Sequence, residues 1–204
     1  RVGKRPLAQA IAALVNCARQ NSPCGECASC LAALRGDHPD VLEVEPKTLT
    51  STGKTARRRL IPVAAVTEKR DDAHDYERHV VQWLETSPTH RRKVVVVDGA
   101  EFLNEESANA LLKVVEEPPH RALFVFLAED ASAVLPTIAS RASRLNVAPV
   151  GDDELRDTLR LLGESDPDLL AFAAGRPGVV VERERAREAL ADARALFDAL
   201  GTSM

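Results

Sequence analysis

The sequence predicts an α/β fold, in which a parallel sheet flanked by helices is followed by a small helical domain. Residues 94–97 are four consecutive valines, a β-branched apolar run typical of a strand buried on both faces of a parallel sheet. Short apolar runs alternate with segments of helical periodicity as far as residue 148, and charged helical segments fill residues 149–204. We therefore expect two domains, at 1–148 and 149–204.

The first predicted elements precede the valine strand. An apolar helix is expected at 7–15, and a second helix carries Cys30 and continues through 31–34. A turn at 36–40 then leads into a short apolar strand at 41–44. Apolar residues at helical spacing predict a crossover helix at 73–85, packed on the sheet before the valine strand begins.

The elements after the valine strand have clear end signals. Asn104 is expected to cap a helix at 105–117, and Pro118 with Pro119 ends it. Glu105 and Glu106 in its first turn complement the positive end of the helix dipole. Further strands are predicted at 123–127 and 143–147, and helices of the second domain at 152–162, 168–174 and 182–200.

The composition is that of a soluble intracellular protein. The chain has 204 residues, of which 45% are hydrophobic, so it can bury a sizeable core. No apolar run approaches the roughly 18 residues of a membrane-spanning helix and no signal peptide opens the chain, so we expect a cytoplasmic protein with no membrane partner. A net charge of −4 argues against a nucleic-acid-binding surface over the whole protein. Because the first residue is Arg1 rather than Met, we expect a fragment or an unseen front.

The four cysteines of the chain lie close together in the spacing C-x6-C-x2-C-x2-C. Two overlapping C-x2-C pairs and one further thiolate can close a tetrahedron around a structural Zn²⁺. Two disulfides, which need an oxidising compartment, and an iron–sulfur cluster are the alternatives. We expect zinc, held by Cys17, Cys24, Cys27 and Cys30.

The amino end and the end of the valine strand share features with a nucleotide site. Gly3-Lys4 before an apolar helix resembles the end of the phosphate-binding motif G-x4-G-K-[ST], although an ordinary turn would also explain it. Arg5 stands where the motif has a hydroxyl that ligates Mg²⁺. Asp98 follows the valines, at the sheet edge where open α/β sheets bind ligands, and Gly99 stands where a water-orienting acid is usual.

Two other polar segments have simpler explanations. His38 and Asp40 could be imagined as metal ligands, but next to a cysteine quartet that fills a zinc site we expect them to order the turn before strand 41–44. The basic segment 48–59 is expected to be a solvated loop, with contact to a phosphate backbone as the alternative.

In their order along the chain, the motifs resemble the bacterial clamp-loader branch of the AAA+ family. After the Gly-Lys helix and the cysteine cluster come GDHPDV, KVVVVDGAEFL, SANALLKVVEEPP, LPTIASR and AGRPG. Only residues 48–70 show no match. The resemblance implies a P-loop NTPase-like α/β domain with an inserted zinc module at about 17–30, a helical lid, and a collar domain that is absent or barely begun here.

Clamp loaders contain motor subunits that hydrolyse ATP and a stator that does not, and this sequence resembles the stator. Arg5 and Gly99 depart from the motors' G-K-T and D-E motifs. Gly3, Lys4 and Asp98 are therefore expected to form a degenerate site that binds no ATP or Mg²⁺ productively, so the chain has no ATPase activity of its own. Glu101 is expected to point elsewhere.

The resemblance also implies a role for one arginine. Arg141, preceded by Ser140, matches the Ser-Arg-Cys segment of the family, with Ala142 in place of the cysteine. Arg141 is thus expected to act in trans as an arginine finger at the ATP site of a neighbouring subunit. A salt-bridging surface arginine is the alternative. Arg176 is a candidate nucleotide sensor, with helix capping or packing against the sheet as the alternatives.

The implied function is to help load the sliding clamp on primed DNA as a component of the DNA polymerase III holoenzyme. The implied partners are gamma/tau motor subunits, the delta subunit, the sliding clamp and primer-template DNA. An active gamma/tau motor is one alternative, which Arg5 and Gly99 disfavour. A zinc-containing DNA-binding module is the other, and it is disfavoured by the acidic residues around the cysteines and by an aromatic content of 3%.

Overall fold

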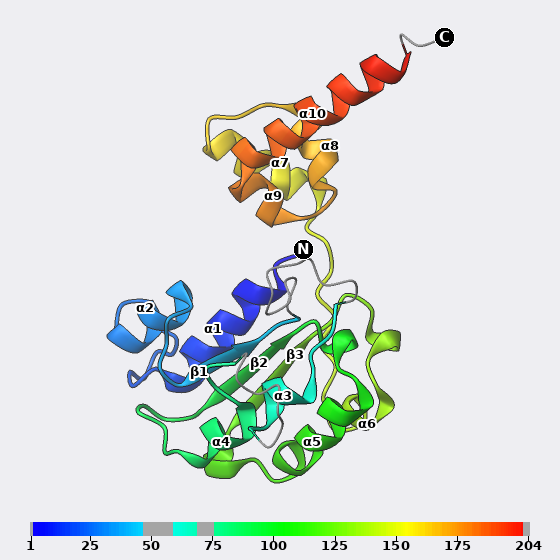
Figure 1. The fold of residues 1–204 in the computed structure, drawn as a ribbon. Helices are drawn as coiled ribbons and strands as arrows, with labels where there is room; N and C mark the ends of the chain where they lie inside the picture. Colours follow the sequence, from blue (N-terminus) through cyan, green and yellow to red (C-terminus); the bar gives the residue numbers. More distant parts are fainter. Residues whose placement is uncertain (1, 47–58, 69–75, 202–204) are drawn as a thin grey trace. The chain divides into compact units, whose positions relative to one another are not determined.

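The computed structural model describes residues 2–46, 59–68 and 76–201, with the side chains of 196–201 left out (Figure 1). Two compact units make up the chain: Arg5–Arg144 form one, and Arg1–Lys4 with Leu145–Met204 form the other. The structure thus divides just after Arg144, whereas the sequence analysis placed the boundary after residue 148.

A parallel sheet forms the centre of the first unit. Over the described residues it has three strands, β1 (Val41–Val44), β2 (Val94–Asp98) and β3 (Leu123–Leu127), in the order β1-β2-β3. Val94 lies opposite Val41 on one side and Leu123 on the other. The valine strand is therefore central, and its four valines are all buried. The predicted α/β class with a parallel sheet flanked by helices is confirmed.

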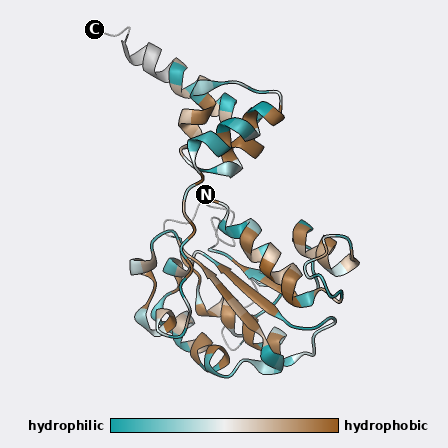
Figure 2. Cartoon of the chain, turned by 180° about the vertical axis from the view of Figure 1, so that it is seen from behind, coloured by the Kyte–Doolittle hydropathy of each residue, from teal (hydrophilic) through white to brown (hydrophobic). Residues whose placement is uncertain are grey.

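Helices cover both faces of the sheet (Figure 1). The side chains of Val95 and Val97 face one apolar cluster, which includes residues of α3 (Val63–Val66), α4 (Val80–Glu85), α5 (Glu105–Glu116) and α6 (Pro136–Ala139). Val94 and Val96 face a second cluster, with residues of α1 (Lys4–Asn16) and α2 (Ala28–Arg35). This alternation is why a continuous apolar run is stable in the central strand, and Figure 2 shows the strands of the sheet as mostly hydrophobic.

Most predicted ends agree with the structure. Asn104 caps α5, accepting a hydrogen bond from the backbone N–H of Ser107 at 2.8 Å. The predicted crossover helix at 73–85 is shorter than expected: it begins at Val80, and residues 73–75 lie outside the described part. The short helices α3 and α6 were not predicted, because segments of four residues are too short to show a helical repeat.

The predicted strand at 143–147 is wrong. These residues have no regular secondary structure, and Leu145 is 70% exposed. Alternating apolar and polar residues fit the strand pattern locally. A strand also needs a hydrogen-bonded neighbour, and within the described ranges β3 pairs only with β2.

The second unit is helical. Its core contains Leu155, Leu159, Leu169, Ala173 and Val180, contributed by three short helices. These are α7 (Asp152–Leu161), α8 (Pro167–Ala173) and α9 (Pro177–Val181), and they are followed by α10 (Arg183–Gly201). The helix predicted at 182–200 corresponds to α10, whereas the short helix α9 was not predicted. Among the described residues, no helix combines the length and the apolar character needed to cross a membrane.

Candidate functional site

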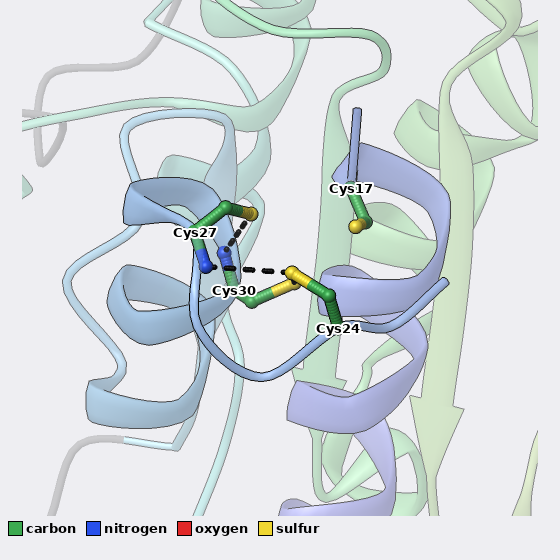
Figure 3. A group of neighbouring side chains, drawn as sticks. All are labelled: Cys17, Cys24, Cys27 and Cys30. Atoms are coloured by element: carbon green, nitrogen blue, oxygen red, sulfur yellow. Dashed lines mark hydrogen bonds between the residues drawn. The ribbon is translucent and has the colours of Figure 1, made fainter. Parts of the chain in front are cut away.

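The four cysteines come together between α1 and α2 (Figure 3). Cys17 follows the last turn of α1, and its N–H donates to the carbonyl of Ala13 at 2.9 Å. Cys27 is the N-cap of α2, Cys30 lies in its first turn, and Cys24 lies in the connecting segment. The sulfur atoms lie within 4.8 Å of one another. The end of α1, the start of α2 and the segment between them thus bring the four thiols together around a common point.

The spacing of the sulfurs fits a tetrahedral zinc ion. Zn–S bonds of about 2.3 Å separate the sulfurs of a tetrahedral centre by about 3.8 Å, and the Sγ atoms of Cys24 and Cys30 are 3.9 Å apart. That distance is far beyond a disulfide bond, and all four cysteines are free thiols. The donor set therefore fits a closed structural Cys₄ centre, in which a bound Zn²⁺ would crosslink α1 to α2.

Backbone N–H groups prepare the cluster for thiolates. The N–H of Cys27 points at Sγ of Cys24, and the N–H of Cys30 points at Sγ of Cys27, both at 3.4 Å. Hydrogen bonds from the backbone at Cys24 and Arg19 lower the pKa of Cys17 to about 6, whereas burial raises the pKa of Cys30 to about 11. A cation bound among the sulfurs would favour the ionised form of all four.

An ion pair lies in the segment that was expected to form a degenerate nucleotide site. Gly3 and Lys4 lie at the amino end of α1, with Gly3 at a φ of +95°. The next residue, Arg5, places its Nε 2.6 Å from Oε1 of Glu43 on β1. The hydrogen bond to Glu43 raises the pKa of Arg5, and the negative charges of Glu45 and Asp98 act in the same direction. A guanidinium thus lies among the acidic groups near the ends of β1 and β2, where it cannot coordinate a metal.

The residue after Asp98 has a backbone suited to glycine. Gly99 has φ 99° and ψ 53°, a left-handed conformation. A Cβ atom at this position would lie 2.7 Å from Cδ2 of Phe102. The carboxylate of Glu101 is turned toward the end of β3, where its Oε1 accepts the backbone N–H of Glu129 at 3.1 Å. No acid can therefore enter at residue 99 without rearrangement, and Glu101 is engaged elsewhere.

Arg141 follows α6, and its guanidinium is held by an ion pair and hydrogen bonds within its own chain. Its Nε and Nη2 lie 2.6 and 2.5 Å from the same oxygen, Oε1 of Glu116 at the end of α5. Its Nη1 donates to the carbonyl of Thr137 at 2.9 Å and to Oγ of Ser140 at 3.3 Å. Glu116 was not recognised in the sequence. The sequence shows Glu116 only as one of two adjacent glutamates in the VVEEPP segment, and nothing in that segment indicates which of the two contacts Arg141.

The buried side chains of His38 and Asp40 form a network with His90, a more exposed residue that the sequence analysis missed. Both oxygens of Asp40 accept backbone N–H groups, from Thr89 at 2.7 Å and from His90 at 2.6 Å. Nδ1 of His90 lies 3.1 Å from the second oxygen. Burial of Asp40 favours its neutral form, but these hydrogen bonds outweigh it and hold the pKa of Asp40 below its usual value.

The other ring of the network has a defined tautomer. Nδ1 of His38 accepts the N–H of Asp40 at 3.0 Å, so the ring proton is on Nε2 and is shared with Oγ of Ser29 at 3.0 Å. The Ser29 hydroxyl in turn donates to the carbonyl of Asn16. A metal could bind here only by displacing these partners. The geometry therefore favours the expected role in ordering the turn, and it ties β1 to the segments around the cysteines.

Two further expectations concern basic residues. The side chain of Arg176 donates to the carbonyls of Ala173 and Phe172 at 2.9 and 2.5 Å, which favours helix capping over nucleotide sensing. Of the basic segment 48–59, only Arg59 lies within the described residues, and its guanidinium stacks over the ring of Phe102.

Fold and site together define a P-loop NTPase-like α/β protein with a cluster of four cysteines between α1 and α2. The sequence profile of the family described as "DNA polymerase III, delta subunit" matches residues 1–151. The chain belongs to this family. The resemblance drawn from the motifs is thereby confirmed.

Named relatives agree with the family. "DNA polymerase III subunit delta'" of Pseudomonas aeruginosa is 33% identical over 183 residues, covering 86% of this chain and 50% of that protein. The same subunit of Haemophilus influenzae is 30% identical over 186 residues, covering 89% and 51%. "DNA polymerase III subunit gamma/tau" of Mycobacterium tuberculosis is 34% identical over 142 residues, covering 68% and 21%. The chain thus spans about half the length of the delta' relatives that it matches.

Proposed function

We propose that this chain is a non-hydrolysing component of the DNA polymerase III clamp loader and that it supplies Arg141 to the ATP site of a neighbouring motor subunit. Its partners are gamma/tau motor subunits and a delta subunit, and the assembled complex acts on the sliding clamp and primer-template DNA in the cytoplasm.

The observation that carries the proposal is the pair of Arg5 and Glu43. In a working P-loop site, the residue after the lysine is a Ser or Thr whose hydroxyl binds Mg²⁺. Here a cation paired at 2.6 Å with a carboxylate takes that place. The glycine after Asp98 supports the same conclusion, since its backbone does not accept the acid that orients water. Such a chain can keep the fold and the trans-acting arginine while it hydrolyses no ATP.

Arg141 is suited to act outside its own chain. Its side chain is 36% exposed, and it belongs to the α/β unit rather than to the helical unit. A guanidinium offers five N–H donors in a planar fork that matches phosphate oxygens, and an arginine finger uses this fork to stabilise charge that develops on the γ-phosphate.

The test is reconstitution with the motor and delta subunits of the same organism. Arg141→Ala should assemble normally and slow ATP hydrolysis at the served site by about tenfold or more. Clamp loading should slow with it. Arg144→Ala, which removes an exposed arginine three residues away, is the matched control and should leave both rates unchanged. Unchanged hydrolysis and clamp loading in Arg141→Ala would contradict the role of Arg141.

The zinc centre belongs to the same proposal as a structural element. The four thiols leave no open coordination position for substrate, which is typical of a structural rather than a catalytic zinc. An active motor of the gamma/tau kind is the second candidate, since such subunits are also relatives. Mg²⁺-dependent ATP hydrolysis by the isolated chain, abolished by Asp98→Ala, would favour it.

A further inference from the structure

The contact between Glu116 and Arg141 links two elements that are 25 residues apart in the chain. Glu116 is the last residue of α5, and Arg141 lies just after α6, so the packing of α6 on α5 decides whether they meet. The carboxylate approaches the edge of the guanidinium formed by Nε and Nη2. Its neighbour Glu117 has no ion pair among the described residues and offers an internal comparison.

The remaining donors of Arg141 can be counted. Of the five N–H groups of a guanidinium, one on Nε and one on Nη2 point to Glu116. Nη1 reaches the carbonyl of Thr137 and Oγ of Ser140, which uses at most its two hydrogens. Among the described residues no acceptor meets the second hydrogen of Nη2, at the tip of the fork, so it can serve a partner outside the chain. The side chain is therefore held along its edges while its tip stays available.

This arrangement contributes more to orientation than to folding. Both side chains are exposed, at 36% for Arg141 and 48% for Glu116, and ion pairs between exposed side chains add little to stability. A long arginine side chain, however, loses considerable rotamer freedom when it is fixed. An anchored guanidinium has lost that freedom before the neighbour binds, which lowers the entropy that must be given up in the assembled site.

We propose that Glu116 is a positioning residue, which holds Arg141 in the orientation in which it enters the neighbouring subunit's ATP site. This inference rests on the proposed role of Arg141 as a finger. Glu116 touches neither nucleotide nor metal and acts only through the guanidinium. Its carboxylate also keeps Arg141 from pairing with other acidic groups on the surface.

The experiment uses the reconstituted clamp-loader complex with Glu116→Ala, Glu116→Gln and the control Glu117→Gln. We expect Glu116→Ala to lower kcat for ATP at the served site roughly three- to tenfold, the range that a lost orienting contact can cause, with KM unchanged. Glu116→Gln keeps one acceptor oxygen and should give a smaller decrease. Glu117→Gln should match the wild type, and the thermal unfolding of all three chains should be unchanged.

A double-mutant cycle separates this inference from the proposed function. If Glu116 acts through Arg141, Glu116→Ala has no further effect in an Arg141→Ala background. If Arg141→Ala alone has no effect, the finger itself is refuted. If Arg141→Ala slows hydrolysis while Glu116→Ala leaves it unchanged, raises it, or adds an independent loss in the double variant, the positioning role is refuted and the finger stands.

Discussion

Nε of Arg5 lies 2.6 Å from Oε1 of Glu43, an ion pair between the first turn of α1 and the next-to-last residue of β1. Glu45 lies 3.5 Å from the same guanidinium. A phosphate-binding motif would have a small hydroxyl here, close to a metal ion. The guanidinium brings positive charge to this place and is neutralised by residues of its own chain. Arg5 is therefore part of a local network of ion pairs. Replacing Arg5 alone would leave Glu43 and Glu45 without this partner.

Gly99 is expected to be intolerant of any side chain. Gly99→Ala forces an L-residue into a left-handed conformation and brings its Cβ to 2.7 Å from Phe102, so we expect a loss of about 2–4 kcal/mol in the free energy of unfolding. Urea denaturation measures this loss. For the same reason, Gly99→Glu should destabilise the chain and should not create ATPase activity.

Two other glycines separate the causes of this effect. Gly163 also has a positive φ, of 76°, but a Cβ there meets no atom within 4 Å. The loss of unfolding free energy in Gly163→Ala therefore measures the cost of the left-handed backbone alone. Gly151 has a φ of −64° and open space around it, so Gly151→Ala should change stability little. A loss in Gly99→Ala no larger than that in Gly163→Ala would show that the contact with Phe102 relaxes freely.

The cysteine cluster is expected to bind one zinc ion per chain. Elemental analysis of the purified protein should find this stoichiometry, and Co²⁺ in its place should show the thiolate charge-transfer bands of a tetrahedral S₄ site. Cys30→Ser removes a ligand from the first turn of α2 and should abolish stoichiometric binding. It should also lower the free energy of unfolding by roughly 2 kcal/mol or more, because metal binding is coupled to folding. Bound iron with visible absorbance, or no metal at all, would contradict this assignment.

The Asp40 network is expected to stabilise the fold in a pH-dependent way. Asp40→Asn replaces one carboxylate oxygen by an NH₂ group, so only one of the two backbone N–H groups, of Thr89 or of His90, keeps its acceptor. We expect a loss of about 1–3 kcal/mol at neutral pH, the usual effect of leaving a buried donor unpaired. Denaturation of both chains in urea measures the difference.

The sign of the pH dependence follows from the lowered pKa of Asp40. Its ordinary pKa is 3.8, and the folded chain holds it lower, so the unfolded chain binds a proton first as the pH falls. The stabilisation by Asp40 is therefore complete above about pH 5 and is lost as the pH falls through 3.8 and then through the lower folded pKa. The difference between wild type and Asp40→Asn should shrink over this acidic range. A difference that stays constant down to pH 3 would contradict the assigned cause.

Local sequence predicted those elements whose signals lie within a few residues. The valine strand, strands 41–44 and 123–127, and the helix capped by Asn104 all appeared as expected, because burial pattern and end signals are short-range properties. The strand expected at 143–147 was wrong, since its pattern was present but no neighbouring strand was available to pair with it. The cysteine cluster could also be predicted, because its four thiols lie within residues 17–30 at a spacing typical of metal sites.

The sequence by itself thus determined the α/β class, the family, and the set of four cysteines that lie together. Only the tertiary structure decided which charged groups meet. Arg5 with Glu43, Asp40 with His90, and Glu116 with Arg141 are joined across helices and strands far apart in the chain. Such pairs depend on strand order and helix packing, which bring distant residues within hydrogen-bonding distance and leave adjacent, chemically identical ones such as Glu117 apart. For that reason the motif around Arg141 could indicate a candidate arginine, but not the carboxylate that holds it.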